Sequence, residues 1–210
     1  MNMQKPFVVA LTGASGVVYG LNVVKRLREL GYSVALTISE PAKLVIREEL
    51  NFDVGDLKEP NLSGEWFGNS ACGSISYYHY QDLTAPIASG SYPIEGMIIA
   101  PASTACFSCI ANGISETLIE RAAECAIKEG RRLVIVPREM PLSALHLEHL
   151  LKLARAGVRV VPAMPAFYAG VSQVQDLIDF VVGKVLDQFN VEHMLFRRWT
   201  GANVPVEEGG

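Results

Sequence analysis

Small residues that could bind a phosphate follow the first apolar run of the sequence. The run Phe7–Leu11 stops at Thr12–Gly16, a Thr-Gly-Ala-Ser-Gly turn that leads into a helical pattern. A helix that begins at such a turn offers backbone N–H groups and a positive dipole end to an anion. The turn therefore predicts a site for a phosphate-bearing cofactor, and a tight turn without a ligand is the alternative.

Charged and hydroxyl side chains follow two later apolar runs. Arg138 and Glu139 come directly after the run 132–137, and Tyr168 follows a Pro-rich turn. Residues that directly follow a buried parallel strand face the ligand crevice, so these side chains could contact a phosphate. A surface ion pair and a plain core aromatic are the alternatives. Arg121 and Lys128 share one face of a predicted helix, which is either a second phosphate site or a solvated stripe.

Three other features also have two interpretations. His146 and His149 could bind a metal, but no further ligands cluster with them, so we expect histidines of a helix surface or an interface. Cys106 and Cys109 form a C-x-x-C without a second pair at zinc spacing. We expect them, like Cys72 and Cys125, to be small reduced residues instead of a redox or metal centre. Trp199 either docks on a neighbouring subunit or forms a flat wall of a site.

Strands and helices alternate along the chain. The apolar runs predict strands at 7–11, 32–38, 96–101, 132–137 and 158–161. Helical patterns lie at 17–30, 42–50, after 102–104, and at 115–130, 143–156 and 174–189, while 51–81 is an irregular excursion with one short strand or helix. Near-continuous apolar strands between helices indicate an α/β fold with a parallel sheet covered on both faces. In such a sheet the turns after the strands converge.

Length and charge restrict the class of protein. The 210 residues, 50% of them hydrophobic, can bury one large core, so we expect a single domain over 1–189 and a tail, 190–210, with a flexible tip. A net charge of -4 without a basic, aromatic stripe argues against a nucleic-acid partner and favours a small molecule. No leader pattern precedes Pro6 and no apolar run reaches about 18 residues, so we expect neither secretion nor a membrane span, but a cytoplasmic protein.

A nicotinamide-dependent reductase is the rival interpretation of the opening turn. The spacing of Gly13, Gly16 and Gly20 is one residue off the usual dinucleotide pattern, and Glu40 could take the place of the ribose-binding acid. Short-chain reductases also need a Tyr-x-x-x-Lys pair, and no tyrosine of this chain has a lysine four residues later. That absence argues against the rival.

Five motifs in a fixed order resemble those of the UbiX family of flavin prenyltransferases. They span about residues 6–199 and are Thr12–Gly16, Ile87–Ser91, Ile110–Ser115, Leu133–Glu139 and Met164–Tyr168. The resemblance implies a three-layer α/β, flavodoxin-like or Rossmann-like fold with a mostly parallel sheet, assembled into a homododecamer. It also implies transfer of the dimethylallyl group of dimethylallyl monophosphate to N5 and C6 of reduced FMN. The product, prenylated FMN, would serve UbiD-type decarboxylases.

The resemblance also implies roles for individual residues. FMN would be surrounded by Gly13, Ala14, Ser15, Ser39, Ser103, Thr104, Ala105, Cys106 and Arg121. The prenyl phosphate would be bound, without a metal and by more than one subunit, by Lys128, Arg138, Tyr168 and Lys184. Ser15, Glu49, Glu139 and Trp199 would be catalytic, with Ser15 and Glu139 relaying a proton and Trp199 stabilising an allylic cation. The tail would pack on a neighbouring subunit.

The sequence departs from the family pattern at one motif. Residues 101–106 read Pro-Ala-Ser-Thr-Ala-Cys where many members have Pro-Cys-Ser-Met-Lys-Thr, so Ala105 replaces a lysine. Lys184 replaces an arginine of some members, which keeps the charge but loses a two-pronged contact. The related FMN-dependent cysteine decarboxylases have asparagine at the position of Ala105, so they are the less favoured alternative, together with a flavin carrier without catalysis. The sequence leaves open whether the donor is the monophosphate or the diphosphate.

Overall fold

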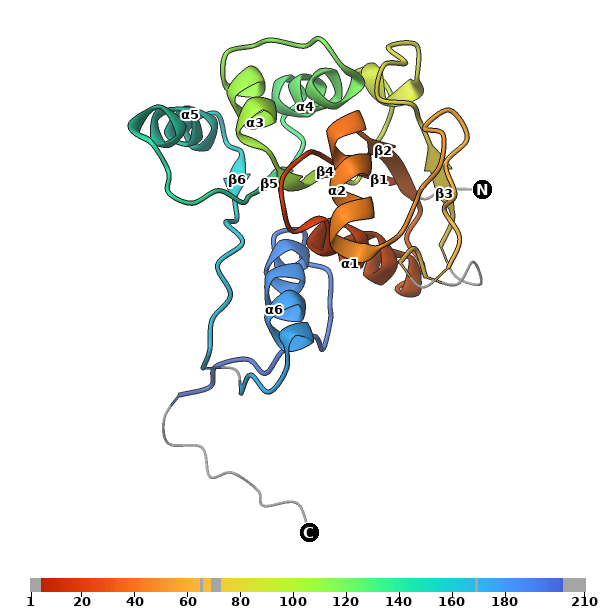
Figure 1. Ribbon diagram of the computed structural model, residues 1–210. Helices are drawn as coiled ribbons and strands as arrows, with labels where there is room; N and C mark the ends of the chain where they lie inside the picture. Colours follow the sequence, from red (N-terminus) through yellow and green to blue (C-terminus); the bar gives the residue numbers. More distant parts are fainter. Residues whose placement is uncertain (1–4, 65, 69–72, 169, 202–210) are drawn as a thin grey trace.

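A computed structural model describes residues 5–64, 66–68, 73–168 and 170–201. Within these residues six strands form one sheet in the order β3-β2-β1-β4-β5-β6, and every pairing is parallel (Figure 1). The strands are β1 (Phe7–Leu11), β2 (Val34–Ile38), β3 (Ile75–Tyr77), β4 (Gly96–Ala102), β5 (Leu133–Pro137) and β6 (Arg159–Val160). The helices are α1 (Val17–Glu29), α2 (Glu40–Leu50), α3 (Thr104–Ala111), α4 (Leu118–Lys128), α5 (Ala144–Arg155), α6 (Val174–Asp187) and a short 3-10 turn, Pro86–Ala88.

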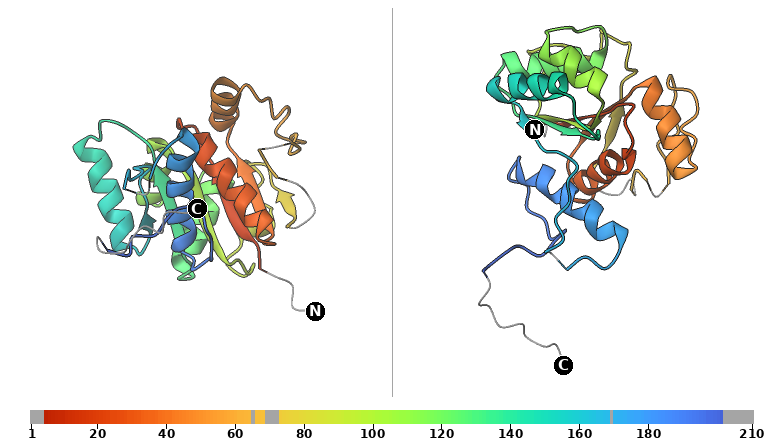
Figure 2. Two further views of the ribbon diagram at one scale, coloured as in Figure 1. Left: turned by 90° about the horizontal axis from the view of Figure 1, so that it is seen from below. Right: turned by 60° about the vertical axis from the view of Figure 1, so that its left-hand side comes forward.

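Helices cover both faces of the sheet, as the turned views in Figure 2 show. On β1, Phe7 and Val9 point into a core shared with α1, α2 and α6, whereas Val8 and Ala10 point into a core shared with α3, α4 and α5. All five residues of β1 are buried, which explains why the strand reads as an unbroken apolar run. The three-layer α/β fold with a parallel sheet is therefore confirmed.

Serine and threonine caps set where three helices begin. Ser39 accepts a hydrogen bond from the Ala42 N–H at the start of α2, and Ser103 accepts one from the Cys106 N–H at the start of α3. Thr117 caps α4, and Glu120 returns to the Thr117 N–H to complete a capping box. The prediction that α4 begins at Ser115 is therefore wrong, because the cap lies two residues later.

A buried arginine organises the excursion between α2 and β4. Arg28, on α1, donates to the carbonyl oxygens of Gly68 and Gly73 at 2.9 Å each and also to that of Phe67. The excursion contains the expected short strand, β3, which pairs with β2 at the edge of the sheet. At the other edge the strand predicted over 158–161 is shorter, since β6 covers only Arg159–Val160.

The chain beyond β6 leaves the sheet and comes back as α6 (Figure 1). Residues 191–199 then lie along α6 of the same chain: Phe196 packs on Phe180 with ring centroids 4.8 Å apart, and Arg198 pairs with Asp187 at 2.7 Å. The predicted packing of the tail on a neighbouring subunit stays a prediction, and its tip, 202–210, lies outside the described residues. Among the helices that the structure describes, none combines the length and the apolar character of a membrane span.

Candidate functional site

A crevice is expected where β1 and β4 lie side by side at the centre of the sheet. The chain passes from β1 toward one edge of the sheet and from β4 toward the other, so the turns after these two strands diverge. In parallel sheets such a switch point, at the carboxyl ends of the strands, is the usual ligand site. The turns that border it are 12–16 after β1 and the cap residue Ser103 after β4.

A buried hydroxyl connects the two central turns. Thr12 is 3% exposed; its Oγ1 donates to the Pro101 carbonyl oxygen at 2.7 Å and accepts from the Ser103 N–H at 2.7 Å. The first turn of α3 is thereby held against the turn after β1. Thr12 belongs to the opening motif, but the sequence predicted no role for it. Only the fold places Pro101 and Ser103 beside its side chain.

Close backbone packing requires glycine at several positions in and near the opening turn. A Cβ on Gly13 would lie 2.3 Å from Cβ of Pro41, so glycine lets the first turn of α2, and Ser39 with it, approach the turn after β1. Gly16 has φ +93°, a left-handed conformation that side chains disfavour. Gly20 faces the carbonyl oxygen of Ala100, where a Cβ would lie at 1.9 Å. The small residues are thus needed by the fold even before a ligand is considered.

A carboxylate occupies the beginning of α1. The Gly16 N–H donates to both Glu49 oxygens, at 2.9 and 3.1 Å, and the Val17 N–H donates to one of them at 3.3 Å. Glu49 thus reaches from α2 to two of the N–H groups, those of Gly16 and Val17, that the opening turn was expected to offer to an anion. A negative charge is favourable at a helix N-terminus. The same contact brings Glu49, a predicted catalytic residue, to the opening turn.

Arg138 lies over the opening turn, as its position after β5 predicted. Its Nε donates to the Ser15 carbonyl oxygen at 3.1 Å, and a Cβ on Gly16 would lie 3.8 Å from its Cγ. Glu139 accepts a hydrogen bond from the Met140 N–H at 3.0 Å. Tyr19, one turn into α1, was not predicted: burial raises the pKa of its phenol, and the charge of Arg138 acts against that rise. Arg138 and Tyr19 thus flank Gly16.

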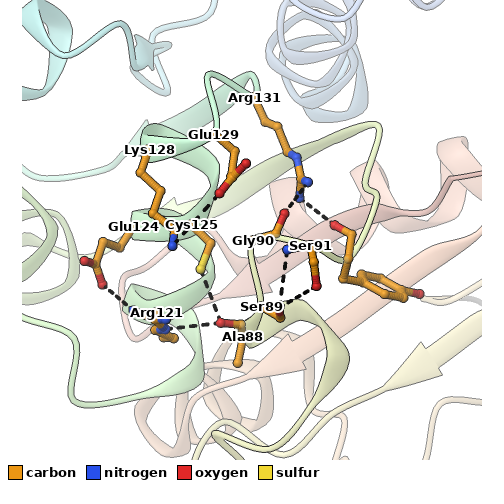
Figure 3. A network of polar contacts seen from close by, with 11 residues as sticks. Ala88, Ser89, Gly90, Ser91, Arg121, Glu124, Cys125, Lys128, Glu129 and Arg131 are labelled. Atoms are coloured by element: carbon orange, nitrogen blue, oxygen red, sulfur yellow. Dashed lines mark hydrogen bonds and ion pairs between the residues drawn. The ribbon is translucent and has the colours of Figure 1, made fainter.

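Arg121 and Lys128 lie together on α4, beside the motif 87–91 (Figure 3). Arg121 donates to the Ala88 carbonyl oxygen at 3.1 Å and pairs with Glu124 at 3.0 Å. Lys128 approaches Glu129 at 4.0 Å. Ser89 and Ser91 bond to each other through their hydroxyls at 2.9 Å. The helix face thus offers two cations next to two exposed hydroxyls.

The direction of α4 separates Lys128 from the crevice of its own chain. The helix ends at Lys128, shortly before β5 begins at Leu133, so this lysine lies near the amino end of that strand. The crevice lies at the carboxyl end, and a five-residue strand spans about 16 Å, more than a lysine side chain can cross. Lys128 and Arg138, both predicted to bind the prenyl phosphate, are therefore not brought together within one chain.

Tyr168, Lys184 and Trp199 form a third group around α6, of which only Lys184 belongs to the helix. The Tyr168 ring lies 5.9 Å from the Phe180 ring and 5.9 Å from the Trp199 ring, edge to face in both cases. Tyr168 is 57% exposed and Trp199 65%, so each presents a face to solvent. Lys184, one turn after Phe180, lines a groove of about 570 Å³ between α5, β6 and α6.

The first turn of α3 contains the remaining predicted flavin contacts. Ser103 caps the helix, Thr104 is half-buried, Ala105 is exposed and Cys106 is buried. Burial raises the pKa of the Cys106 thiol well above its usual range, and the charge of Glu120 adds to the rise. The Cys106 side chain is therefore a protonated, apolar thiol at neutral pH and not a reactive thiolate.

The two histidines of the possible metal pair have structural partners. His146 Nδ1 accepts from the Ser143 N–H at 3.3 Å, and His149 Nδ1 lies 2.8 Å from the Ser108 hydroxyl oxygen. No group of three or more His, Cys, Asp or Glu side chains suited to a metal ion occurs in the described part of the chain. Cys72 lies outside it.

Comparisons with known proteins identify the family of the chain. A family model described as Flavoprotein matches residues 1–186. A protein of Halalkalibacterium halodurans named Flavin prenyltransferase UbiX is 50% identical over 92% of both chains. The structure of AnUbiX (PadA1) in complex with FMN and dimethylallyl pyrophosphate is 35% identical, covers 94% of this chain and 98% of its own, and superposes with a TM-score of 0.84.

Two further structures show the range of related proteins. A dodecameric FMN-dependent UbiX-like decarboxylase from Escherichia coli O157:H7 is 40% identical, with a TM-score of 0.81 over 93% of this chain and all of its own. A peptidyl-cysteine decarboxylase, with 16% identity and a TM-score of 0.56, shares the fold alone. Relatives that are 43–50% identical over more than nine tenths of this chain carry the name flavin prenyltransferase UbiX. The chain belongs to the flavoprotein family and, within it, to the UbiX flavin prenyltransferases.

Proposed function

We propose that this chain joins the dimethylallyl group of dimethylallyl monophosphate to N5 and C6 of reduced FMN, giving prenylated FMN. The observation that carries the proposal is the switch point between β1 and β4, where Thr12 fixes the turn after β1 to the start of α3 and Arg138 covers Ser15. Relatives up to 50% identical over almost the whole chain carry the prenyltransferase name. A UbiD-type decarboxylase is the proposed recipient of the product.

The residues around the crevice fit FMN. The turn 12–16 and the cap hydroxyls of Ser39 and Ser103 supply N–H and O–H donors, and Arg138 supplies a cation, which together suit a phosphate and a ribityl chain. Thr104, Ala105 and Cys106 would form the wall beside the ring system. Ala105 supplies no charge there, so Arg138 takes the main electrostatic role. When bound, the reduced flavin supplies the two nucleophilic atoms of the reaction.

The side chains of this chain would assist the break of the allylic C–O bond. Negative charge develops on the departing phosphate, and Arg138, Lys128, Lys184 and the Tyr168 hydroxyl would stabilise it. Positive charge develops on the allyl group, and the exposed face of Trp199 would stabilise that charge. Ser15 and Glu139 would carry a proton between the flavin and the phosphate, with Glu49 beside them.

We also propose that a complete site contains residues of more than one subunit. Within one chain the predicted residues form three groups: the crevice, the α4 face with Arg121 and Lys128, and the α6 group with Tyr168, Lys184 and Trp199. A symmetric assembly brings different faces of one chain together, and the relative from Escherichia coli is dodecameric. A dodecamer of a single domain, 1–189, with its tail at subunit contacts is the arrangement that we propose.

The mass of the flavin product tests the proposed reaction. The protein would be incubated under anaerobic conditions with reduced FMN and either dimethylallyl monophosphate or the diphosphate, with oxidised FMN as the control. We expect a flavin heavier by one prenyl unit only in the incubations with reduced FMN. The two donors are tested separately, so the result also shows whether the monophosphate or the diphosphate is accepted. An unchanged flavin mass from FMN-loaded protein would contradict the proposal and would favour a flavin carrier.

A further inference from the structure

A half-buried carboxylate on α6 fixes the segment that carries Trp199. Asp187 accepts from Arg198 at 2.7 and 3.3 Å and lies 3.2 Å from Nε2 of His193. The Asp187 side chain is 18% exposed and that of His193 only 3%. Lys184 adds a further cation at 3.6 Å. Ion pairs of this kind contribute more than fully exposed ones, because water screens them less.

A glycine one turn earlier allows the same segment to lie close to α6. A Cβ on Gly183 would lie 2.5 Å from Cε1 of Phe196 and 2.7 Å from Cε1 of His193. Two rings therefore rest directly on the backbone of the helix. Glycine inside a helix costs stability relative to alanine, so its presence here has a packing reason.

A series of ring contacts, tilted or edge to face, connects Asp187 to Trp199. The Arg198 guanidinium lies 5.4 Å from the centroid of Phe196, which packs on Phe180 at 4.8 Å. Phe180 packs edge to face with Tyr168, and Tyr168 with Trp199, and the ring centroids are 5.9 Å apart in each pair. Because Arg198 directly precedes Trp199, its pairing with Asp187 determines where the indole ring can lie.

We propose that Asp187, Arg198 and Gly183 are positioning residues that hold Trp199 edge to face against Tyr168. Asp187 and Arg198 fix the chain next to the indole, and Gly183 lets Phe196 and His193 seat on α6. The significance of this position for catalysis rests on the proposed function, in which Tyr168 and Trp199 face the prenyl donor. The placement of the two rings does not depend on that function.

Fluorescence of Trp199 measures the placement directly. The chain has two tryptophans, so Trp66→Phe leaves Trp199 as the only indole. In that background we expect Arg198→Met and Gly183→Ala each to raise the acrylamide quenching constant by up to about 1.5-fold, because Trp199 is already 65% exposed and loses only its remaining contacts when the segment separates from α6. Gly183→Ala is informative because alanine favours the helix, so loss of folding is not its expected effect. Arg198→Lys, which keeps the charge, should restore part of the protection, and Glu48→Gln on the surface of α2 is the matched control.

The rate of prenyl transfer shows whether the placement of Trp199 matters for catalysis. We expect the two variants to lower kcat about tenfold or more while the affinity for FMN stays unchanged, since misplacement of one reacting group by about 1 Å is enough for such a loss. Quenching that stays at the parent value in both variants would overturn the proposal, and so would raised quenching with an unchanged kcat. If the parent protein transfers no prenyl group, the proposed function fails, but the quenching comparison still decides whether these residues hold Trp199.

Discussion

Glu49 accepts two hydrogen bonds from the backbone N–H of Gly16, at 2.9 and 3.1 Å. The carboxylate therefore occupies the helix terminus at which a phosphate would be expected from the opening motif. Two anions cannot share the same N–H groups without strong repulsion, so a phosphate at this crevice depends on other donors while Glu49 stays in place. The Ser39 and Ser103 hydroxyls and Arg138 are the donors that the structure places nearby.

Replacement of this carboxylate by an amide separates its structural and chemical roles. In Glu49→Gln the amide oxygen can still accept from Gly16, but the charge and the ability to carry a proton are lost. We expect the free energy of unfolding to fall by about 0.5–1 kcal/mol and the FMN dissociation constant to change less than about threefold. The rate of prenyl transfer should fall about 100-fold or more.

Glu48→Gln is the control for this experiment, because Glu48 is an exposed neighbour on α2 that pairs with Arg47. Single-turnover kinetics with saturating donor and a fluorescence titration of FMN give the two quantities. A rate equal to that of the control would remove Glu49 from the proposed chemistry.

The separation of Lys128 from the crevice predicts that defective subunits complement each other. Arg138→Met and Lys128→Met should each be almost inactive as pure assemblies. In assemblies mixed after dissociation and reassembly, about a quarter of the sites would receive a wild-type residue from both contributing subunits. We expect activity to return to about that fraction of the wild-type value.

The control mixture combines Arg138→Met with the double variant Arg138→Met/Lys128→Met, in which no site is complete. Activity recovered in the first mixture and not in the second would show that the site lies between subunits. If neither mixture recovers activity although native mass spectrometry shows that the subunits have exchanged, a site that takes Arg138 and Lys128 from different subunits is contradicted.

Local patterns explain which parts of the fold and site could be predicted. The unbroken apolar run of β1 reflects burial on both faces, and Arg138 could be placed at the crevice because it directly follows a central strand. The start of α4 was misplaced because Ser115 and Thr117 are both good caps, and tertiary contacts decide between them: Ser115 bonds to Glu124 instead.

Contacts between distant segments explain what could not be predicted. Glu49 meets Gly16 only because α2 packs beside α1, and Thr12 meets Ser103 only because β1 and β4 are neighbours. Nothing in the residues around Arg28 indicates that this arginine is buried, since its partners are backbone carbonyl groups about 40 positions away. Such pairs follow from the topology and have no periodic signal in the sequence.

Arg28 should be among the most important polar residues for stability. Its guanidinium is bonded to the carbonyl oxygens of Phe67, Gly68 and Gly73, and Arg28→Met would leave these groups without their donor. We expect the free energy of unfolding to fall by about 2–4 kcal/mol. Urea unfolding followed by circular dichroism measures the change. The exposed Arg47→Met is the control, expected within about 0.5 kcal/mol of wild type, and an equal effect of both variants would contradict the role of Arg28.

Cys106 should be unreactive in the folded protein despite its C-x-x-C motif. Burial keeps its thiol protonated, and burial together with the charges of Glu120 and Glu116 also raises the pKa of the Cys109 thiol. We expect alkylation of Cys106 by iodoacetamide at pH 8 at least ~10-fold slower in the native protein than in concentrated urea. Peptide mass spectrometry resolves each cysteine. Rapid native labelling, or a Cys106–Cys109 disulfide, would show that the pair is a redox centre.

The contact between Asp187 and Arg198 should withstand mild acid and fail only at low pH. Burial acts to raise the pKa of Asp187, but Arg198 and His193 lower it more, so the pKa of the folded state lies below the usual 3.8. A lowered pKa means that the carboxylate contributes stability above the unfolded value and loses it as the pH falls through the folded value. Among the described residues, the cations Lys184 and Arg198 and the titratable His193 face it.

Acrylamide quenching of Trp199 in the Trp66→Phe background should therefore stay constant from about pH 8 to about pH 4 and rise below that range. In Asp187→Asn, which has no carboxyl group to titrate, quenching should be raised at every pH and independent of it. A wild-type transition centred above about pH 5 would contradict control by Asp187. The same titration with Glu48→Gln, which keeps Asp187, should reproduce the wild-type curve.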